Sequence, residues 1–302
     1  MKNYLINVVY GYYFARLLYM INPKWAVNMM YRRAFHRNVN WENPKNLIEK
    51  YYWLLYNTDT SLWTKCADKY KVREFIEEKG CSEILVELYG AWTDVDEIDF
   101  DKLPNQFVLK SNNGCGTVLV VKDKTTLNIK KTKKMLKRWL KYPFGYNGGQ
   151  KHYFSIPPCI IAEELLTQDK TLNKISPSSL VDYKVWCING DPEAILMTFD
   201  RTKVSLKLKL YSPEWKDISH HIVYGGHYPN FNDIQIPKPE CLESMLEIAK
   251  KLSAGFPEVR VDFYIVDNTP KFGELTFSTG FGYFTEEYYN YLGSKIDLDS
   301  YR

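Results

Sequence analysis

The chain has 302 residues, a length that suits two or three lobes sharing a core rather than one minimal domain. Its composition, 45% hydrophobic and 25% charged, is that of a folded soluble protein and excludes long disordered stretches. The formal net charge of +4 is too small for a nucleic-acid-binding protein. The six cysteines form no C-x-x-C pair, which argues against a zinc site or a disulfide scaffold and favours a reducing cytoplasm.

The N-terminal region is expected to be helical over residues 1–60, with breaks at Asn22-Pro23 and Asn43-Pro44. Residues 4–21 form a largely apolar run without a small-residue cleavage site after it. A helix that packs on the protein body or lies in a membrane interface is therefore favoured over a signal peptide or a transmembrane helix. This predicts a cytoplasmic protein, with a peripheral contact of residues 1–21 with the inner membrane face left open.

Helices and short strands follow in the first half of the chain. Residues 65–79 are predicted to form one helix. Residues 106–123 predict a β-hairpin whose first strand ends at Lys110 and whose loop covers 111–116. The segment 128–142 is an amphipathic helix with a basic face, which is either a solvated surface or a contact for an acidic polymer or a membrane.

The second half of the chain indicates antiparallel pairs of strands. A buried strand over 158–166 leads into a polar stretch, and two later strands flank the turn Asn189-Gly190. A helix is expected over 239–254, and strands over 258–266 and 271–277 form a last hairpin. This order of elements indicates α+β lobes rather than a βαβ repeat.

Charged side chains share one face of the last hairpin. By the period of two, Arg260 and Asp262 lie on one face of the first strand, and Glu274 and Thr276 share a face of the second. An odd turn places Asp262 opposite Glu274, whereas an even turn needs a bulge, which Gly273 is able to supply. Neighbouring carboxylates repel unless a cation lies between them, and oxygen ligands suit magnesium. The alternative is an ordinary surface salt bridge.

Two other segments are typical of nucleotide sites, although each pattern alone is common. Lys110 precedes a loop containing Gly114 and Gly116, and a lysine beside flexible backbone N–H groups can cradle phosphate. Residues that leave a buried strand between two lobes offer backbone donors and acceptors to an adenine edge, and the candidates are Glu163, Glu164, Leu165 and Leu166.

Taken in chain order, these segments resemble the ATP-grasp superfamily. The resemblance is closest to the TupA-like branch, which is named for teichuronopeptide synthesis and found in capsule and surface-polysaccharide gene clusters. It covers about residues 40–290. The segments that carry it are NPKNLIEK (43–50), TKCADKYKVRE (64–74), FDKLPNQFVLK (100–110), DYKVWCING (182–190), FPEVRVD (256–262) and GELTF (273–277).

The resemblance implies an α+β ATP-grasp fold in which two lobes grip ATP after a helical N-terminal region. The expected divisions are residues 1–60 for that region, 61–163 for a small lobe with the phosphate loop, and 164–302 for a large lobe with the magnesium site. The implied reaction is ATP-dependent joining of a carboxylate to an amine through an acyl phosphate.

The resemblance also implies roles for single residues. Lys69 and Lys110 would hold the ATP phosphates beneath the loop of Gly114 and Gly116, residues 163–166 would contact adenine, and Asp169 is the candidate for ribose. Catalytic roles fall to Lys184, facing the phosphates, and Arg260, steadying the acyl phosphate and the oxyanion. Magnesium would be bound by three residues: Asp262, Glu274 and Thr276. Most members of the superfamily have Asn where Thr276 stands, although the TupA-like branch tolerates Thr.

The implied substrates are an amine and a carboxylate, the latter on a small molecule or a glycan. One of the two groups would belong to a uronic acid or amino acid of a cell-surface polysaccharide. Two alternatives stay open. One is a metal-dependent glycosyltransferase that uses an Asp-x-Asp pair, for which Asp94-Val-Asp96 and Asp99-Phe-Asp101 are candidates, although an exposed acidic linker also explains them. The other is a non-catalytic ATP-binding relative.

Overall fold

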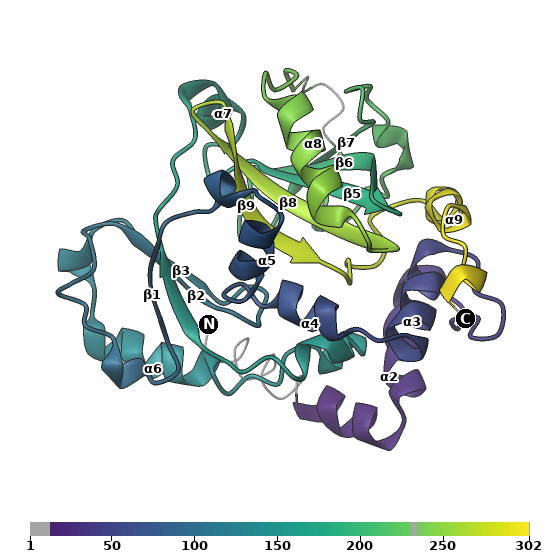
Figure 1. The fold of residues 1–302 in the computed structure, drawn as a ribbon, viewed down its shortest axis with the longest axis horizontal. Coiled ribbons are helices and arrows are strands. Elements are labelled where there is room, and N and C mark those ends of the chain that lie inside the picture. Colours follow the sequence, from purple (N-terminus) through teal and green to yellow (C-terminus); the bar gives the residue numbers. More distant parts are fainter. Residues whose placement is uncertain (1–12, 231–233, 235, 302) are drawn as a thin grey trace. The chain divides into compact units, whose positions relative to one another are not determined.

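The computed structural model describes residues 13–230, 234 and 236–301 (Figure 1). It divides into two compact units, and neither is continuous in sequence. Unit 1 contains the described residues up to 38 together with 59–75 and 86–165. Unit 2 contains 39–58, 76–85 and the described residues from 166 onward. The division into 1–60, 61–163 and 164–302 remains a prediction.

Unit 1 is built on a four-stranded antiparallel sheet in the order β1-β4-β2-β3. The helix α6 (Ile129–Trp139) covers one face, where its buried Leu136 packs with Phe107 and Leu109 (Figure 1). Because side chains alternate along a strand, the opposite face of the same sheet carries Lys110 and Glu163. The strands are β1 (Leu88–Trp92), β2 (Phe107–Ser111), β3 (Val118–Val121) and β4 (Ile160–Glu163).

The other helices of unit 1 lie before this sheet in the sequence or between its strands. Residues 13–21 are helical, and α2 (Pro23–Phe35) follows, with the Asn22 side chain accepting a hydrogen bond from the Trp25 N–H as its N-cap. No helix among the described residues is long and apolar enough to cross a membrane. The remaining helices that lie wholly or partly in unit 1 are α4 (Ser61–Ala67) and α5 (Val72–Glu78), with 3₁₀ turns at Val95–Glu97, Lys124–Thr126, Tyr146–Gly148 and Lys151–Tyr153.

The predicted single helix over 65–79 is wrong, because the chain breaks between α4 and α5. The Asp68 carboxylate accepts hydrogen bonds from the backbone N–H groups of Tyr70 (2.8 Å) and Lys71 (3.3 Å). It also accepts one from the Asn112 amide at 2.9 Å. A side chain that bonds its own backbone two residues on competes with a continuous helix. The break places Lys69 in a turn, beside the loop that follows β2.

Unit 2 is built on a five-stranded antiparallel sheet in the order β7-β6-β5-β8-β9. The helix α8 (Leu242–Ser253) packs on one face, where the Cys187 thiol lies 4.0 Å from the Ala249 carbonyl oxygen (Figure 1). Its strands are β5 (Asp182–Ile188), β6 (Asp191–Phe199), β7 (Lys207–Tyr211), β8 (Glu258–Val266) and β9 (Thr269–Thr276). The other helices lying mainly in this unit are α3 (Leu47–Asn57), α7 (Lys170–Ile175) and α9 (Glu286–Ser294), with 3₁₀ turns at Ser82–Ile84, Ser219–His221 and Asp299–Tyr301.

Candidate functional site

The pairing of β8 with β9 depends on a bulge. Their turn has two residues, Asp267 and Asn268, both with left-handed backbone angles, and is therefore even. The register shifts beyond Asp262, which lies opposite Glu274, so that Gly273 is the extra residue. A Cβ at this glycine would lie 3.0 Å from the Asp262 carbonyl oxygen. The expected bulge at Gly273 is confirmed, and it brings the two carboxylates side by side.

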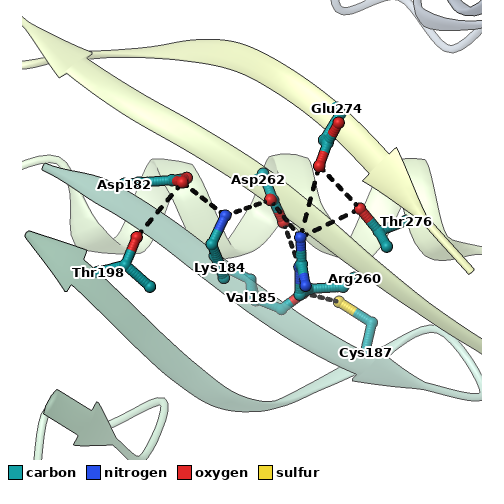
Figure 2. Close-up of polar contacts among 9 residues, drawn as sticks. All are labelled: Asp182, Lys184, Val185, Cys187, Thr198, Arg260, Asp262, Glu274 and Thr276. Atoms are coloured by element: carbon teal, nitrogen blue, oxygen red, sulfur yellow. Dashed lines mark hydrogen bonds and ion pairs between the residues drawn. The ribbon is translucent and has the colours of Figure 1, made fainter. Parts of the chain in front are cut away.

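Arg260 is the centre of the charged cluster on these strands (Figure 2). Its guanidinium makes two hydrogen bonds of 2.6 Å to Asp262, one to each carboxylate oxygen. The same group donates to the Thr276 hydroxyl at 3.2 Å and lies 3.5 Å from a Glu274 oxygen. Arg260, Asp262 and Thr276 are buried, whereas the Glu274 side chain is 34% exposed. Glu274 is thus the carboxylate of this group that solvent and ligands can reach.

A second cation enters the cluster from β5. The Lys184 ammonium lies 2.6 Å from one Asp262 oxygen and 2.5 Å from one Asp182 oxygen. Lys184 pairs with Asp262 across the strands, and Asp182 shares its strand face by the period of two. The other Asp182 oxygen is buried and has no hydrogen-bond partner within the described part of the chain. A bound water or cation would satisfy this buried acceptor.

The charges in this cluster shift one another's ionisation. Burial raises the pKa of Asp182, although the ammonium of Lys184 opposes the rise. Burial alone would lower the pKa of Lys184, but the carboxylates of Asp182 and Asp262 outweigh it and raise that pKa. Burial also acts against the Arg260 cation, and Asp262 again reverses the direction, so that the pKa of Arg260 is raised. Both cations therefore stay charged, and with Glu274 the cluster contains three carboxyl groups for two cations.

An aromatic side chain, Trp186, packs against the Arg260 guanidinium of the cluster. The Arg260 guanidinium carbon lies 5.3 Å from the centre of the buried Trp186 ring, within the range of a cation–π contact. Trp186 pairs with Arg260 across β5 and β8. Sequence reasoning missed both Trp186 and Asp182. The period of two on β5 placed them on the face of Lys184 and was the signal that could have found them.

In unit 1, the loop between β2 and β3 is held by the side chain of Asn112. Its amide donates to Asp68 and to the Pro157 carbonyl, both at 2.9 Å, and its carbonyl accepts from the Cys159 N–H at 2.8 Å. Gly114 fits between two hydroxyls, because a Cβ there would lie 2.5 Å and 2.6 Å from oxygens of the flanking Thr117 and Ser111. The loop is thus shaped by fixed polar contacts, as a phosphate-binding loop would require.

The two lysines predicted to contact phosphate are both in unit 1. The Lys69 ammonium donates to the Gly114 carbonyl oxygen at 2.9 Å, which ties this lysine to the loop. Lys110 lies 2.5 Å from a Glu163 oxygen, and both side chains are mostly buried. Glu163 is therefore the ion-pair partner of Lys110. Its carboxylate already binds a cation, so a contact of Glu163 with adenine would involve its backbone.

The residues after β4 leave the strand without regular structure. The Glu164 N–H donates to the Glu87 carbonyl, and the Glu164 side chain is exposed. Leu165 and Leu166 are half-buried. Asp169, the candidate for ribose, is exposed and is the N-cap of α7, where it accepts from the Leu172 N–H at 2.8 Å. One of its carboxylate oxygens thus has a structural role already.

The Asp-x-Asp pairs are explained by local structure. Asp94 accepts from the Asp96 N–H, and Asp99 accepts from the Asp101 N–H, as capping residues do. Asp96 forms an exposed ion pair with Lys137 at 2.6 Å. No group of three or more histidine, cysteine, aspartate or glutamate residues suited to a metal was found among the described residues. The capping hydrogen bonds and the exposed ion pair account for these aspartates as parts of an acidic linker.

Comparison with protein families decides the family of this chain. The family model described as TupA-like ATPgrasp matches residues 49–297. The chain belongs to the TupA-like ATP-grasp family. The match includes the charged cluster around Arg260, the loop between β2 and β3, and both sheets, so the α+β ATP-grasp fold expected from the sequence is confirmed. A search of curated proteins finds no match.

Solved structures similar to this family member include a ligase and a synthetase. D-alanine–D-alanine ligase from Bacillus anthracis complexed with ATP is 16% identical over 77% of this chain and 63% of that chain, with a TM-score of 0.44. An ADP complex of purK, N5-carboxyaminoimidazole ribonucleotide synthetase, is 14% identical over 76% of this chain and 50% of that chain, with a TM-score of 0.45. The chain thus spans less than two thirds of their length, and the fold assignment rests on the family match.

Proposed function

We propose that this TupA-like protein is an ATP-dependent carboxylate–amine ligase. The observation that carries the proposal is the pairing of Asp262 with Glu274 on adjacent strands, with Arg260 and Lys184 around them. Membership of an ATP-grasp family supports the same reading. The similar solved structures include a ligase complexed with ATP and a ligase complexed with magnesium and ADP.

The donor set of the cluster fits magnesium. Carboxylate and hydroxyl oxygens are the ligands that this ion prefers, and the candidates are Asp262, Glu274 and Thr276. The cluster has one carboxyl group more than it has cations, and Glu274 is exposed enough to receive a ligand. When bound there, magnesium would neutralise phosphate charge and polarise a phosphoryl oxygen. Asp262 already accepts hydrogen bonds from the two cations Lys184 and Arg260. We therefore propose that the Glu274 carboxylate, which has more freedom to move, adjusts its position to coordinate magnesium.

ATP is the proposed cosubstrate. The ammonium groups of Lys69 and Lys110 would bind its phosphates, with the backbone of the loop around Gly114 and Gly116. The backbone of residues 163–166 would contact the adenine edge, and the free oxygen of Asp169 would bind ribose. The roles of these residues are proposals that rest on the family and on their placement beside the loop and strand described above.

The proposed reaction has two steps. A carboxylate oxygen of the substrate attacks the γ-phosphorus of ATP, the bond to the bridging oxygen breaks, and ADP leaves an acyl phosphate behind. An amine nitrogen then attacks the carbonyl carbon, the bond from that carbon to the phosphate oxygen breaks, and the nitrogen loses a proton. The products are an amide and inorganic phosphate. The protein contributes mainly positioning and charge neutralisation.

Arg260 and Lys184 are the catalytic residues of this proposal. Their raised pKa values keep both side chains cationic at neutral pH. Held by Asp262 and by the Trp186 face, the guanidinium cannot reorient freely, so its charge is preorganised for the oxyanion that develops when the amine attacks. Lys184 would face the transferring phosphoryl group. The substrates are proposed to include a uronic acid or amino acid of a cell-surface polysaccharide, on the strength of the family alone.

The test is the double variant Asp262→Asn with Glu274→Gln. With ATP, magnesium and a panel of uronic and amino acids, the wild type should release phosphate only when a carboxylate is present. The variant should lose this release by at least about a hundredfold. Full activity of the variant would show that the magnesium assignment is wrong. Nucleotide binding without carboxylate-dependent phosphate release by the wild type would instead indicate a non-catalytic ATP-binding relative.

A further inference from the structure

A helix near the N-terminus of unit 1 turns its large apolar side chains outward. Phe14, Leu17 and Ile21 follow the three- and four-residue spacing of a helical stripe over residues 13–21. Their exposed fractions are 61%, 59% and 65%. Ala15, on another side of this helix, is 4% exposed. The arrangement is the reverse of an ordinary surface helix, in which the apolar stripe faces the protein.

Contacts within unit 1 fix this orientation. The Tyr19 ring packs edge-on against Tyr146 and Phe154, with centroid distances of 5.6 Å and 5.0 Å. The Arg16 guanidinium lies 5.5 Å from the Tyr146 ring centre. These residues lie on the sides of the helix away from the stripe of Leu17 and Ile21. The outward face therefore belongs to a packed helix. We define it as the apolar face, comprising Tyr13, Phe14, Leu17, Met20, Ile21 and Trp25, each exposed by at least 47%.

The charge of the surrounding sequence indicates what covers this face. Residues 1–41 contain six lysine or arginine residues and no aspartate or glutamate. An anionic lipid surface attracts basic residues around an apolar patch and repels acidic ones, whereas a docking protein has no such general requirement. The face also carries Tyr13 and Trp25, whose rings suit the level of the headgroups. The basic residues of this region are Lys2, Arg16, Lys24, Arg32, Arg33 and Arg37.

We propose that the apolar face lies in the interface of an anionic lipid bilayer and holds the protein there peripherally. The described residues of this helix, 13–21, span about 14 Å, less than half the ~30 Å thickness of a hydrocarbon core, and no helix in the described part of the chain is long and apolar enough to cross a membrane. It would thus lie in the plane of the interface, with the basic residues of this region at the lipid phosphates. The proposal does not depend on the reaction proposed above.

The basic helix α6 is a weaker candidate for the same contact. Lys130, Lys134 and Arg138 are exposed, so α6 also attracts anions. Its apolar Leu136 and Trp139, however, are buried against the sheet of unit 1. Charge without an inserting face gives a salt-sensitive encounter rather than stable binding. The two surfaces can be separated by mutation.

The experiment is sedimentation of the full chain with lipid vesicles. We expect binding to phosphatidylcholine vesicles that contain about one third phosphatidylglycerol, with a loss at high salt, and much weaker binding to phosphatidylcholine alone. Leu17→Ser with Ile21→Ser should lower the partition coefficient by about tenfold or more, because both exposed side chains would insert. The matched control is Val204→Ser, which changes a 79% exposed apolar residue outside this face and should bind like the wild type.

Several results would overturn the proposal. One is a double variant that unfolds at the wild-type temperature and still binds vesicles like the wild type. Another is loss of binding in Lys130→Gln, Lys134→Gln, Arg138→Gln with the apolar face intact, which would assign lipid contact to α6. A third is the absence of vesicle binding together with a concentration-dependent dimer that the serine variants abolish, because a second copy would then cover the face.

Discussion

At the scale of single residues, Asp262 and Glu274 differ in surroundings although they pair across two strands. Asp262 is buried between two cations, and removing half of a buried ion pair leaves uncompensated charge. We expect Asp262→Asn to lower the free energy of unfolding by about 3 kcal/mol. The partly exposed Glu274 makes weaker contacts, so Glu274→Gln should cost less than about 1 kcal/mol. Denaturant titration of both variants measures the difference.

The activities of these two variants should fall together despite their different stabilities. Each removes one proposed magnesium ligand, so kcat/KM for ATP is expected to drop by about a hundredfold in both. Glu243→Gln is the control, because that glutamate is 89% exposed on α8. If Glu274→Gln were as unstable as Asp262→Asn, or retained full activity, the separation of roles would be incorrect.

Thr276 shows how one hydroxyl links the cluster. It accepts from Arg260 and donates to a Glu274 oxygen, both at 3.2 Å. Thr276→Val keeps the shape and removes both bonds, and should raise the magnesium concentration needed for half-maximal activity by about tenfold. Thr276→Ser, which keeps the hydroxyl, should stay close to the wild type. Equal effects of the two substitutions in a magnesium titration would exclude a role for the hydroxyl.

At the scale of elements, the strands of the site were more predictable than the helices. Alternation and the turn pair Asn189-Gly190 predicted the β5–β6 pair, and the face shared by Arg260 and Asp262 followed from the period of two. The break at Asp68 was missed, because Asn112, 44 residues along the chain, helps to hold it. Contacts between distant segments leave no local signal in the sequence.

Strand β8 also contains a buried acid that makes stability depend on pH. Burial raises the pKa of Glu258 to about 8, and the nearby Arg260 only partly opposes this. The ordinary value in an unfolded chain is about 4.3. Between these pH values the unfolded chain loses the proton while the folded chain keeps it, so the free energy of unfolding falls as pH rises and the loss is complete above about pH 8.

Glu258→Gln should remove this pH dependence. Relative to the wild type, the variant should gain a few kcal/mol of stability between pH 4 and pH 8. Unfolding titrations of wild type and variant at several pH values measure this difference, and the exposed Glu243→Gln serves as the matched control. Parallel pH profiles for Glu258→Gln and the wild type would show that Glu258 is ionised in the folded protein.

At the scale of the whole molecule, each compact unit is built from segments that are separated in the sequence. Unit 2 takes residues 39–58 and 76–85 from within the stretch that otherwise builds unit 1. The predicted boundaries at residues 60 and 163 assume that each domain is one continuous segment. No local sequence pattern marks where the chain leaves one unit and returns to it. The family resemblance nevertheless supplied roles for residues of both units, because it rests on the order of short segments rather than on their assembly.

Nucleotide binding tests the residues of each unit separately. Calorimetric titration is expected to give one ATP per chain. Lys69→Met, in unit 1, removes an ammonium group beside Gly114 and should weaken ATP binding by about tenfold with or without magnesium. Glu274→Gln, in unit 2, should weaken binding only when magnesium is present, because its carboxylate acts on the ion. Lys71→Met is the control for Lys69, since this neighbouring lysine is exposed and paired with Glu74. An effect of Glu274→Gln without magnesium would contradict the assignment of Glu274 to the ion, and equal effects of Lys69→Met and Lys71→Met would contradict the assignment of Lys69 to the phosphates.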